Sequence, residues 1–109
     1  MAAKLVALWG KPHDVPGFDA HYRSTHLQIV NRWPKLQSYS VTRITGSPVG
    51  GEVPYYQLFE ATFATEEDLR EALRSPAMAE AGQDAAEMVR RFGATLTLLT
   101  GTVEAGTNR

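Results

Sequence analysis

The sequence contains no cysteine, and that absence removes several kinds of chemistry at once. Disulfide bonds, thiolate zinc sites, cysteine-ligated iron–sulfur clusters and cysteine nucleophiles are all excluded. A cysteine-free chain suits a reducing compartment, and we expect the protein to be cytoplasmic. The apolar run at 5–9 is too short for a signal peptide or a membrane-spanning helix, so we expect no membrane partner.

The chain also lacks an excess of charge. Its 11 basic and 12 acidic residues leave a net charge of −1. Domains that bind nucleic acid usually carry a basic excess, so we expect no nucleic-acid partner. A length of 109 residues indicates a single domain over 1–109.

Aromatic residues are scarce in the second half of the chain. All of them except Phe92 lie between Trp9 and Phe63, and every Tyr and Trp lies within the first 56 residues. A binding site that needs rings and hydroxyl groups must therefore draw mainly on the first half.

Apolar periodicity and capping residues predict four strands and two helical segments. Pro34 is expected to end the first helix, because the residue before a proline avoids helical geometry. Thr65 and Ser75 are candidate N-caps, and Gly93 is a candidate stop. The expected strands are 4–11, 36–45, 55–64 and 95–103. The first helix is expected over 18–33. The second helical segment is expected to begin at 65, to run to 74, and to start again at 75 and continue to 93.

The order β-α-β-β-α-β predicts the ferredoxin-like fold, an α+β architecture with a four-stranded antiparallel sheet and two helices on one face. The first strand is apolar on both faces, and the fourth carries Leu98 and Leu99 on opposite faces. Two helices cannot cover both faces of the sheet. We therefore expect a homodimer in which two sheets pack face to face.

The three histidines are the first candidates for chemistry. His13 lies in a loop between two prolines and is expected to be solvated. On an ideal helix His21 and His26 are about 140° apart, which does not favour one shared metal ion. We therefore predict no metal site. The glycine-rich loop at 46–54 matches no nucleotide fingerprint, and no cofactor motif is visible.

His26 follows Tyr22 by four residues, so the two side chains are expected to be neighbours on the aromatic face of the first helix. The imidazole is interpreted either as a general acid or base, or as a buried histidine with structural partners. Tyr55 and Tyr56 are adjacent on a strand, so only one can face the helices. Arg43 and Glu60 are typical of ion pairs at a rim or a dimer interface.

Several short motifs follow one another along the chain. They are Phe18-Asp19-x-x-Tyr22-x-x-x-His26-Leu27, Pro34-x-Leu36-x-x-Tyr39-x-Val41-x-Arg43, Pro54-Tyr55-Tyr56, Phe63 before an acidic helix, Ser75-Pro76, and Phe92-Gly93 before Thr97-Leu98-Leu99. In order and spacing they resemble the EthD family over roughly residues 4–104. The resemblance implies the dimeric α+β barrel superfamily, whose ferredoxin-like subunits pair through their sheets.

The resemblance also implies a hydrophobic pocket for a small cyclic or aromatic molecule. Relatives include methylmuconolactone methylisomerases, polyketide cyclases and cofactor-free monooxygenases. His26 falls on the helix histidine of the family, and Tyr39 on a strand tyrosine that lines the pocket. The methylisomerase branch carries a further histidine where this chain has Glu52, which argues against methylisomerase activity itself.

We therefore expect a homodimer that binds a small hydrophobic, aromatic or cyclic metabolite, in catabolism or secondary metabolism. The reaction would be cofactor-independent acid/base catalysis of the isomerase, lyase, or oxygenase or reductase type. The candidate catalytic residues are His26, Tyr22 and Tyr39, and the candidate pocket walls are Trp9, Phe18, Trp33, Tyr56 and Phe59. Two alternatives stay open, namely a non-catalytic binding or stress-related module on this scaffold, and a haem- or flavin-dependent member of the superfamily.

Overall fold

The computed structural model describes residues 1–106, so the last three residues of the expected domain lie outside the described part. The predicted order of elements is confirmed. The elements are β1 (Ala3–Trp9), α1 (Val15–His21), the π-helix η1 (Tyr22–His26), α2 (Leu27–Val30), β2 (Leu36–Arg43), β3 (Gln57–Phe63), α3 (Glu66–Leu73), α4 (Pro76–Phe92) and β4 (Leu96–Thr102).

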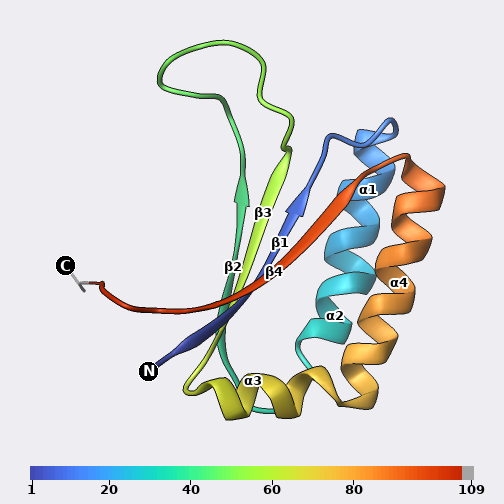
Figure 1. The fold of residues 1–109 in the computed structure, drawn as a ribbon. Helices are drawn as coiled ribbons and strands as arrows, with labels where there is room; N and C mark the ends of the chain where they lie inside the picture. Colours follow the sequence, from blue (N-terminus) through green and yellow to red (C-terminus); the bar gives the residue numbers. More distant parts are fainter. Residues whose placement is uncertain (107–109) are drawn as a thin grey trace.

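The four strands form one antiparallel sheet in the order β2-β3-β1-β4. This is the predicted ferredoxin-like topology, with the first and third strands at the centre. The helices α1, α2 and α4 lie on one side of the sheet, where α1, η1 and α2 run beside α4, and α3 runs across the end of the sheet towards α4 (Figure 1). The long 44–56 connection between β2 and β3 extends beyond the end of the sheet that lies near α1.

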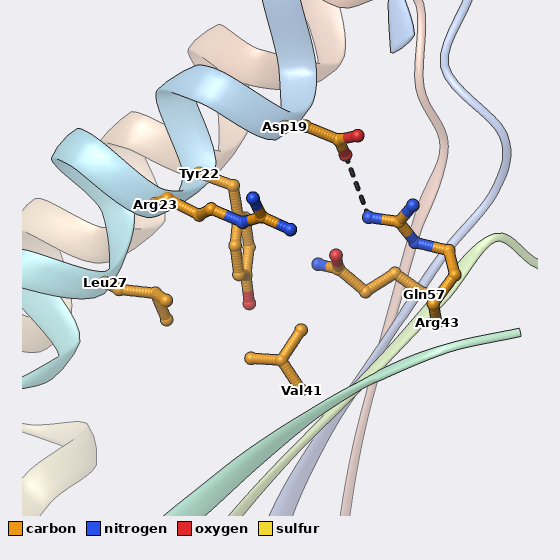
Figure 2. A pocket seen from close by; sticks show the side chains of 7 residues that line it. All are labelled: Asp19, Tyr22, Arg23, Leu27, Val41, Arg43 and Gln57. Atoms are coloured by element: carbon orange, nitrogen blue, oxygen red, sulfur yellow. Dashed lines mark hydrogen bonds and ion pairs between the residues drawn. The ribbon is translucent and has the colours of Figure 1, made fainter. Parts of the chain in front are cut away.

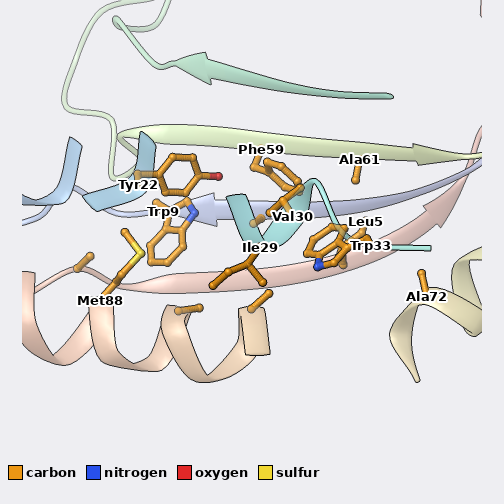
Figure 3. Close-up of a cluster of buried hydrophobic side chains, with 14 of the residues drawn as sticks. Leu5, Trp9, Tyr22, Ile29, Val30, Trp33, Phe59, Ala61, Ala72 and Met88 are labelled. Carbon is orange, nitrogen blue, oxygen red and sulfur yellow. The ribbon is translucent and has the colours of Figure 1, made fainter. Parts of the chain in front are cut away.

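The core lies between the sheet and the helical layer. Burial alternates along β1, where Leu5, Ala7 and Trp9 face the helices. Trp9 and Met88 are almost completely buried, and Figure 3 shows their side chains meeting between α4 and the sheet. A few large side chains thus supply most of the apolar area that holds the two layers together.

Local capping chemistry fixes the ends of the second helical segment as predicted. The Thr65 hydroxyl accepts a hydrogen bond from the Asp68 amide at 3.0 Å, and the Ser75 hydroxyl accepts one from the Met78 amide at 3.1 Å. Gly93 ends α4 in the left-handed conformation, with φ of 67°. These three signals are local, which explains why the sequence alone locates them.

The first helical segment differs from its predicted bounds. It begins at Val15 rather than at residue 18, because the Asp14 side chain accepts a hydrogen bond from the Gly17 amide at 3.0 Å and acts as the N-cap. It ends at Val30 rather than at residue 33. The three residues from Asn31 onward close in turns before Pro34.

The second sheet face has no covering element among residues 1–106. Its apolar members are Val6, Leu8, Leu58 and Leu99, which alternate with the helix-facing residues. Lys4 and Glu60 form an ion pair at 3.3 Å on the same face. Within the described residues no helix is long and apolar enough to cross a membrane.

The two glycines of the α4 region should respond in opposite directions to alanine. In Gly93→Ala the added Cβ would lie 2.6 Å from His13 Nδ1 at a positive φ, so we expect a loss of about 1–2 kcal/mol of unfolding free energy. Gly82→Ala in the middle of α4 meets nothing within 4 Å and should gain up to about 1 kcal/mol. Urea unfolding of both variants measures the difference. Equal effects would contradict this assignment of the helix end.

Candidate functional site

An apolar cavity of about 210 Å³ lies between the sheet and the helical layer. The exposed Leu73 and Leu98 belong to its lining, so it opens between α3 and the edge strand β4. Such a site buries hydrophobic surface and leaves orientation to a few polar groups. The lining residues are Leu5, Ala7, Trp9, Tyr22, His26, Trp33, Phe59, Leu73, Met78, Ala81, Gly82, Ala85, Leu96 and Leu98.

The polar members of this lining come from the π-helical turn η1. The Leu27 amide donates to the Tyr22 carbonyl, a spacing of five residues instead of the four of an α-helix. The rings of Tyr22 and His26 stack with their centroids 5.1 Å apart. The edge of the Trp9 ring system meets both of them. The π turn therefore gathers an imidazole, a phenol and an indole at one wall of the cavity.

Asp84 of α4 holds the two histidines of the first helical segment. Its carboxylate accepts hydrogen bonds from His26 Nδ1 and from His21 Nε2, each at 2.8 Å. An ionised carboxylate only accepts, so His26 carries its proton on Nδ1 and keeps an unprotonated Nε2 when it is neutral. Among residues 1–106 no other side-chain hydrogen bond to His26 is formed.

The predicted angle between the two histidines is therefore wrong. An ideal α-helix would separate His21 and His26 by about 140°. The π turn widens the helix by one residue per turn, which brings residues five apart onto one side. The two side chains meet on a carboxylate, and no group of three metal-ligand side chains suited to a metal ion occurs among residues 1–106.

Burial controls the ionisation of both polar groups at this wall. It lowers the pKa of His26 below its ordinary value of 6.5, while the hydrogen bond to Asp84 opposes the shift. Burial likewise raises the pKa of the Tyr22 phenol above its ordinary value. At neutral pH the cavity therefore presents a neutral imidazole and a protonated phenol.

The two indoles that line the cavity have unsatisfied N–H groups. Nε1 of Trp9 and Nε1 of Trp33 are buried, and neither forms a hydrogen bond of normal geometry among residues 1–106. The Trp9 N–H lies near enough to the Tyr22 phenol to oppose part of the rise in the Tyr22 pKa, so Trp33 is the clearer case. A buried donor without a partner costs about 1–3 kcal/mol. Groups of this kind are more usual where a ligand supplies the missing acceptor than in an ordinary core.

A second, polar pocket of about 270 Å³ lies on the other side of Tyr22, between the first helical segment and β2 (Figure 2). Arg43 donates to the Asp19 carboxylate at 3.0 Å, and the Tyr56 hydroxyl donates to the same carboxylate at 3.0 Å. The Arg43 guanidinium stacks 4.1 Å from the centre of the Tyr56 ring. The lining residues are Asp19, Tyr22, Arg23, Leu27, Val41, Arg43 and Gln57.

The structure brings only part of the predicted site together. Five of the predicted residues line the apolar cavity, namely Trp9, Tyr22, His26, Trp33 and Phe59. Phe18 is completely buried behind them, where it stacks on Tyr22. Tyr39 packs on Phe59 without belonging to the cavity lining, and Tyr56 binds Asp19 beside the polar pocket.

Asp84 is the residue that the sequence analysis missed. On a helical wheel it lies about 60° from Ala81 and about 40° from Met88. Both of these are buried members of the apolar stripe of α4. An acidic residue at the edge of an apolar stripe is the available signal, because a buried carboxylate needs a partner. Arg23 and Gln57 of the polar pocket carried no such signal.

The sequence matches the EthD domain family over residues 12–91. Among solved structures, an ethyl tert-butyl ether (EthD) family protein from Bacillus halodurans is 36% identical, with 94% of this chain and 99% of that chain covered and a TM-score of 0.84. A search of the curated proteins found no significant match.

Two more distant structures share the fold. SnoaB, a cofactor-independent oxygenase from Streptomyces nogalater, is 14% identical, with 99% of this chain and 98% of that chain covered and a TM-score of 0.67. A dimeric ferredoxin-like protein of unknown function from Thermobifida fusca is 15% identical, with 94% and 92% covered and a TM-score of 0.66.

The lowered pKa of His26 makes stability depend on pH. The folded state favours the neutral imidazole, so this contribution is complete above pH 6.5 and is lost as the pH falls from 6.5 through the lower folded pKa. His26→Gln removes the contribution together with the bond to Asp84. We expect the variant to be less stable than the wild type at pH 7, with a gap that narrows towards pH 5, as measured by urea unfolding.

The matched control for this prediction is His13→Gln. His13 is exposed in the loop before α1. The free energy of unfolding of that variant should therefore still fall towards acid pH because of His26, as it does in the wild type. A gap between wild type and His26→Gln that stays constant or widens towards pH 5 would contradict the assignment.

Proposed function

Since this chain belongs to the EthD family, we propose that it is a cofactor-independent acid/base enzyme for a small hydrophobic, cyclic or aromatic compound. The substrate occupies the apolar cavity beside His26, and the reaction is of the isomerase, lyase or oxygenase type. SnoaB, a cofactor-independent oxygenase of the same fold, supports the absence of a cofactor from this chemistry.

The observation that carries the proposal is the hydrogen bond between His26 Nδ1 and the Asp84 carboxylate, 2.8 Å long, at the wall of an apolar cavity. This bond fixes the tautomer and the orientation of the imidazole and leaves Nε2 as the basic atom. A largely shielded carboxylate at Nδ1 also stabilises the imidazolium ion that forms when Nε2 takes a proton. A merely structural histidine would need both ring nitrogens satisfied.

The first chemical step is proton abstraction next to a carbonyl group. His26 Nε2 takes the proton of the substrate C–H bond, and the electron pair of that bond moves onto the carbonyl oxygen to form an enolate. The unpaired indole N–H of Trp9 or Trp33 donates to that oxygen, and an acceptor there satisfies a buried group. Return of the proton to another carbon completes an isomerisation.

Tyr22 has a supporting role in this scheme. Its ring stacks on His26 and holds the imidazole against the Trp9 wall. Because burial raises its pKa, the phenol stays protonated at neutral pH and acts only as a donor or as a steric wall. Tyr39 lies outside the cavity lining, so we assign it to positioning through its contact with Phe59.

We further propose that two copies of this chain pair through the open sheet face. The apolar residues of that face have no covering element among residues 1–106, and one of them, Leu99, is 51% exposed. Pairing of two sheets buries such a surface with strands aligned. The ferredoxin-like protein from Thermobifida fusca has the same fold and is dimeric, which supports self-association of this chain.

The catalytic proposal predicts that His26 and Asp84 act together. We expect turnover of at least one compound from a panel of cyclic lactones and phenolic ketones, measured by loss of substrate in liquid chromatography. His26→Gln should lower the turnover number by about 10²–10⁴-fold, the range for loss of a general base. Asp84→Asn should lower it as well, and the wild-type rate should fall as the pH drops through the pKa of His26, which burial places below 6.5.

The control variant is His13→Gln, which removes a histidine outside the cavity and should keep the wild-type rate. Turnover by His26→Gln at the wild-type rate would contradict the role of His26. Saturable binding of a panel compound without turnover would instead indicate the alternative function, a non-catalytic small-molecule-binding module.

The dimer proposal is tested with two adjacent leucines of β4 that face opposite sides of the sheet. Leu99→Glu places a charge on the open face and should convert the protein to a monomer. Leu98→Glu places the same charge on the helix side, where Leu98 is 60% exposed, and should leave the dimer intact. Light scattering after size-exclusion chromatography measures both masses. A monomeric wild type at micromolar concentration would contradict the proposal.

A further inference from the structure

The polar pocket beyond Tyr22 contains a buried amide without a partner. Gln57 is 2% exposed, and its Nε2 has no hydrogen-bond acceptor among residues 1–106. Gln57 begins β3 and pairs with Trp9 on one side and Arg43 on the other, so the sheet fixes its position. In Figure 2 its amide group extends into the space between the helix and β2. A buried amide without a partner is costly unless the pocket receives an acceptor.

The charges around this amide are not balanced. Asp19 already accepts from Arg43 and Tyr56. Arg23 extends from η1 into the same space in Figure 2, and no carboxylate among residues 1–106 forms an ion pair with it. Two guanidinium groups and one carboxylate leave the pocket with a net charge of +1. One further negative charge would therefore balance the site.

The geometry of the donors matches a carboxylate. The Arg23 guanidinium comes from the helix side of the pocket and the Gln57 amide from the sheet side, and N–H donors of these two kinds are those that bind a carboxylate. The terminal torsion of glutamine is broad and roughly two-fold, so rotation about it can direct the N–H group towards a ligand in the pocket. Leu27 and Val41 line the same pocket and offer apolar contact to the body of a ligand.

We propose that this pocket is a binding site for the carboxylate of a small organic acid with an apolar body. Arg23 and Gln57 donate to the carboxylate, while Asp19 keeps Arg43 in place and limits the site to a single negative charge. A phosphate dianion is disfavoured there because the Asp19 carboxylate would face two charges instead of one. The proposal does not depend on catalysis at His26, because binding is measured directly.

The test uses benzoate and its uncharged counterpart benzamide as probes on the wild-type protein. Titration is followed by ¹H–¹⁵N nuclear magnetic resonance, with the side-chain amide of Gln57 as the reporter. We expect benzoate to saturate at or below about 10 mM, a range that suits a ligand of so few atoms. Benzamide should bind about tenfold more weakly or not at all, since it lacks the charge that pairs with Arg23.

Two variants separate binding from folding. Arg23→Gln should weaken benzoate about tenfold without unfolding the protein, because Arg23 is exposed. Gln57→Met keeps the length of the side chain but removes the amide, so it should weaken benzoate while leaving the melting temperature equal or higher. The matched control is Arg70→Gln, the loss of an exposed arginine on α3 outside this pocket, which should change neither quantity.

The proposal is overturned by any of three results. These are equal affinities for benzoate and benzamide, the same small effect from Arg23→Gln and Arg70→Gln, and saturation that leaves the Gln57 amide resonances unmoved. A loss of both binding and stability in Gln57→Met would assign that amide to the fold, and the Arg23 variant would then decide whether the site exists.

Discussion

The carboxylate of Asp84 joins the two helical segments and defines the chemistry of the cavity between them. It accepts from His21 and His26 at 2.8 Å each, and every member of this trio is largely shielded from water. Hydrogen bonds to a charged group contribute about 1.5–3 kcal/mol each. The arrangement uses the five-residue spacing of the π turn. The helix geometry, the tautomer of His26 and the contact between the two helical segments therefore depend on one another.

Tyr22 lies between two neighbouring sites, one apolar and one polar. On one side Tyr22 lines the apolar cavity with His26, and on the other side it lines the polar pocket with Gln57. Each site retains unpaired donors, the indoles of Trp9 and Trp33 in the first and the Gln57 amide in the second. Together these unpaired donors lower the free energy of unfolding by several kcal/mol. Such groups are retained in binding sites because a bound ligand can supply the missing acceptors.

The sequence predicted those features whose causes are local. Thr65, Ser75 and Gly93 act on backbone groups within four residues, so their caps were visible without a structure. Apolar runs and β-favouring residues between turn signals likewise predicted the strands, and the spaced motifs indicated the EthD family. The π turn was not predictable, because the contact with Asp84 that favours it comes from a helix 58 residues away in the chain. Arg23 likewise became informative only once β2 was seen opposite it.

The two faces of the sheet have different roles in the proposed protein: one lines the candidate sites and the other is available for pairing. The residues that line the cavity and the polar pocket come from the helices, from the helix-facing side of the sheet and, for Trp33, from the turn after α2, all within one chain. The partner in a dimer formed through Leu99 and its neighbours on the open face would therefore add burial and stability but no side chain to either site. A small domain buries a modest share of its surface, and this one leaves uncovered a sheet face that carries four apolar residues beside the Lys4–Glu60 ion pair. In the proposed dimer, separation of the faces would let the site keep unpaired polar groups while burial of the opposite face adds stability.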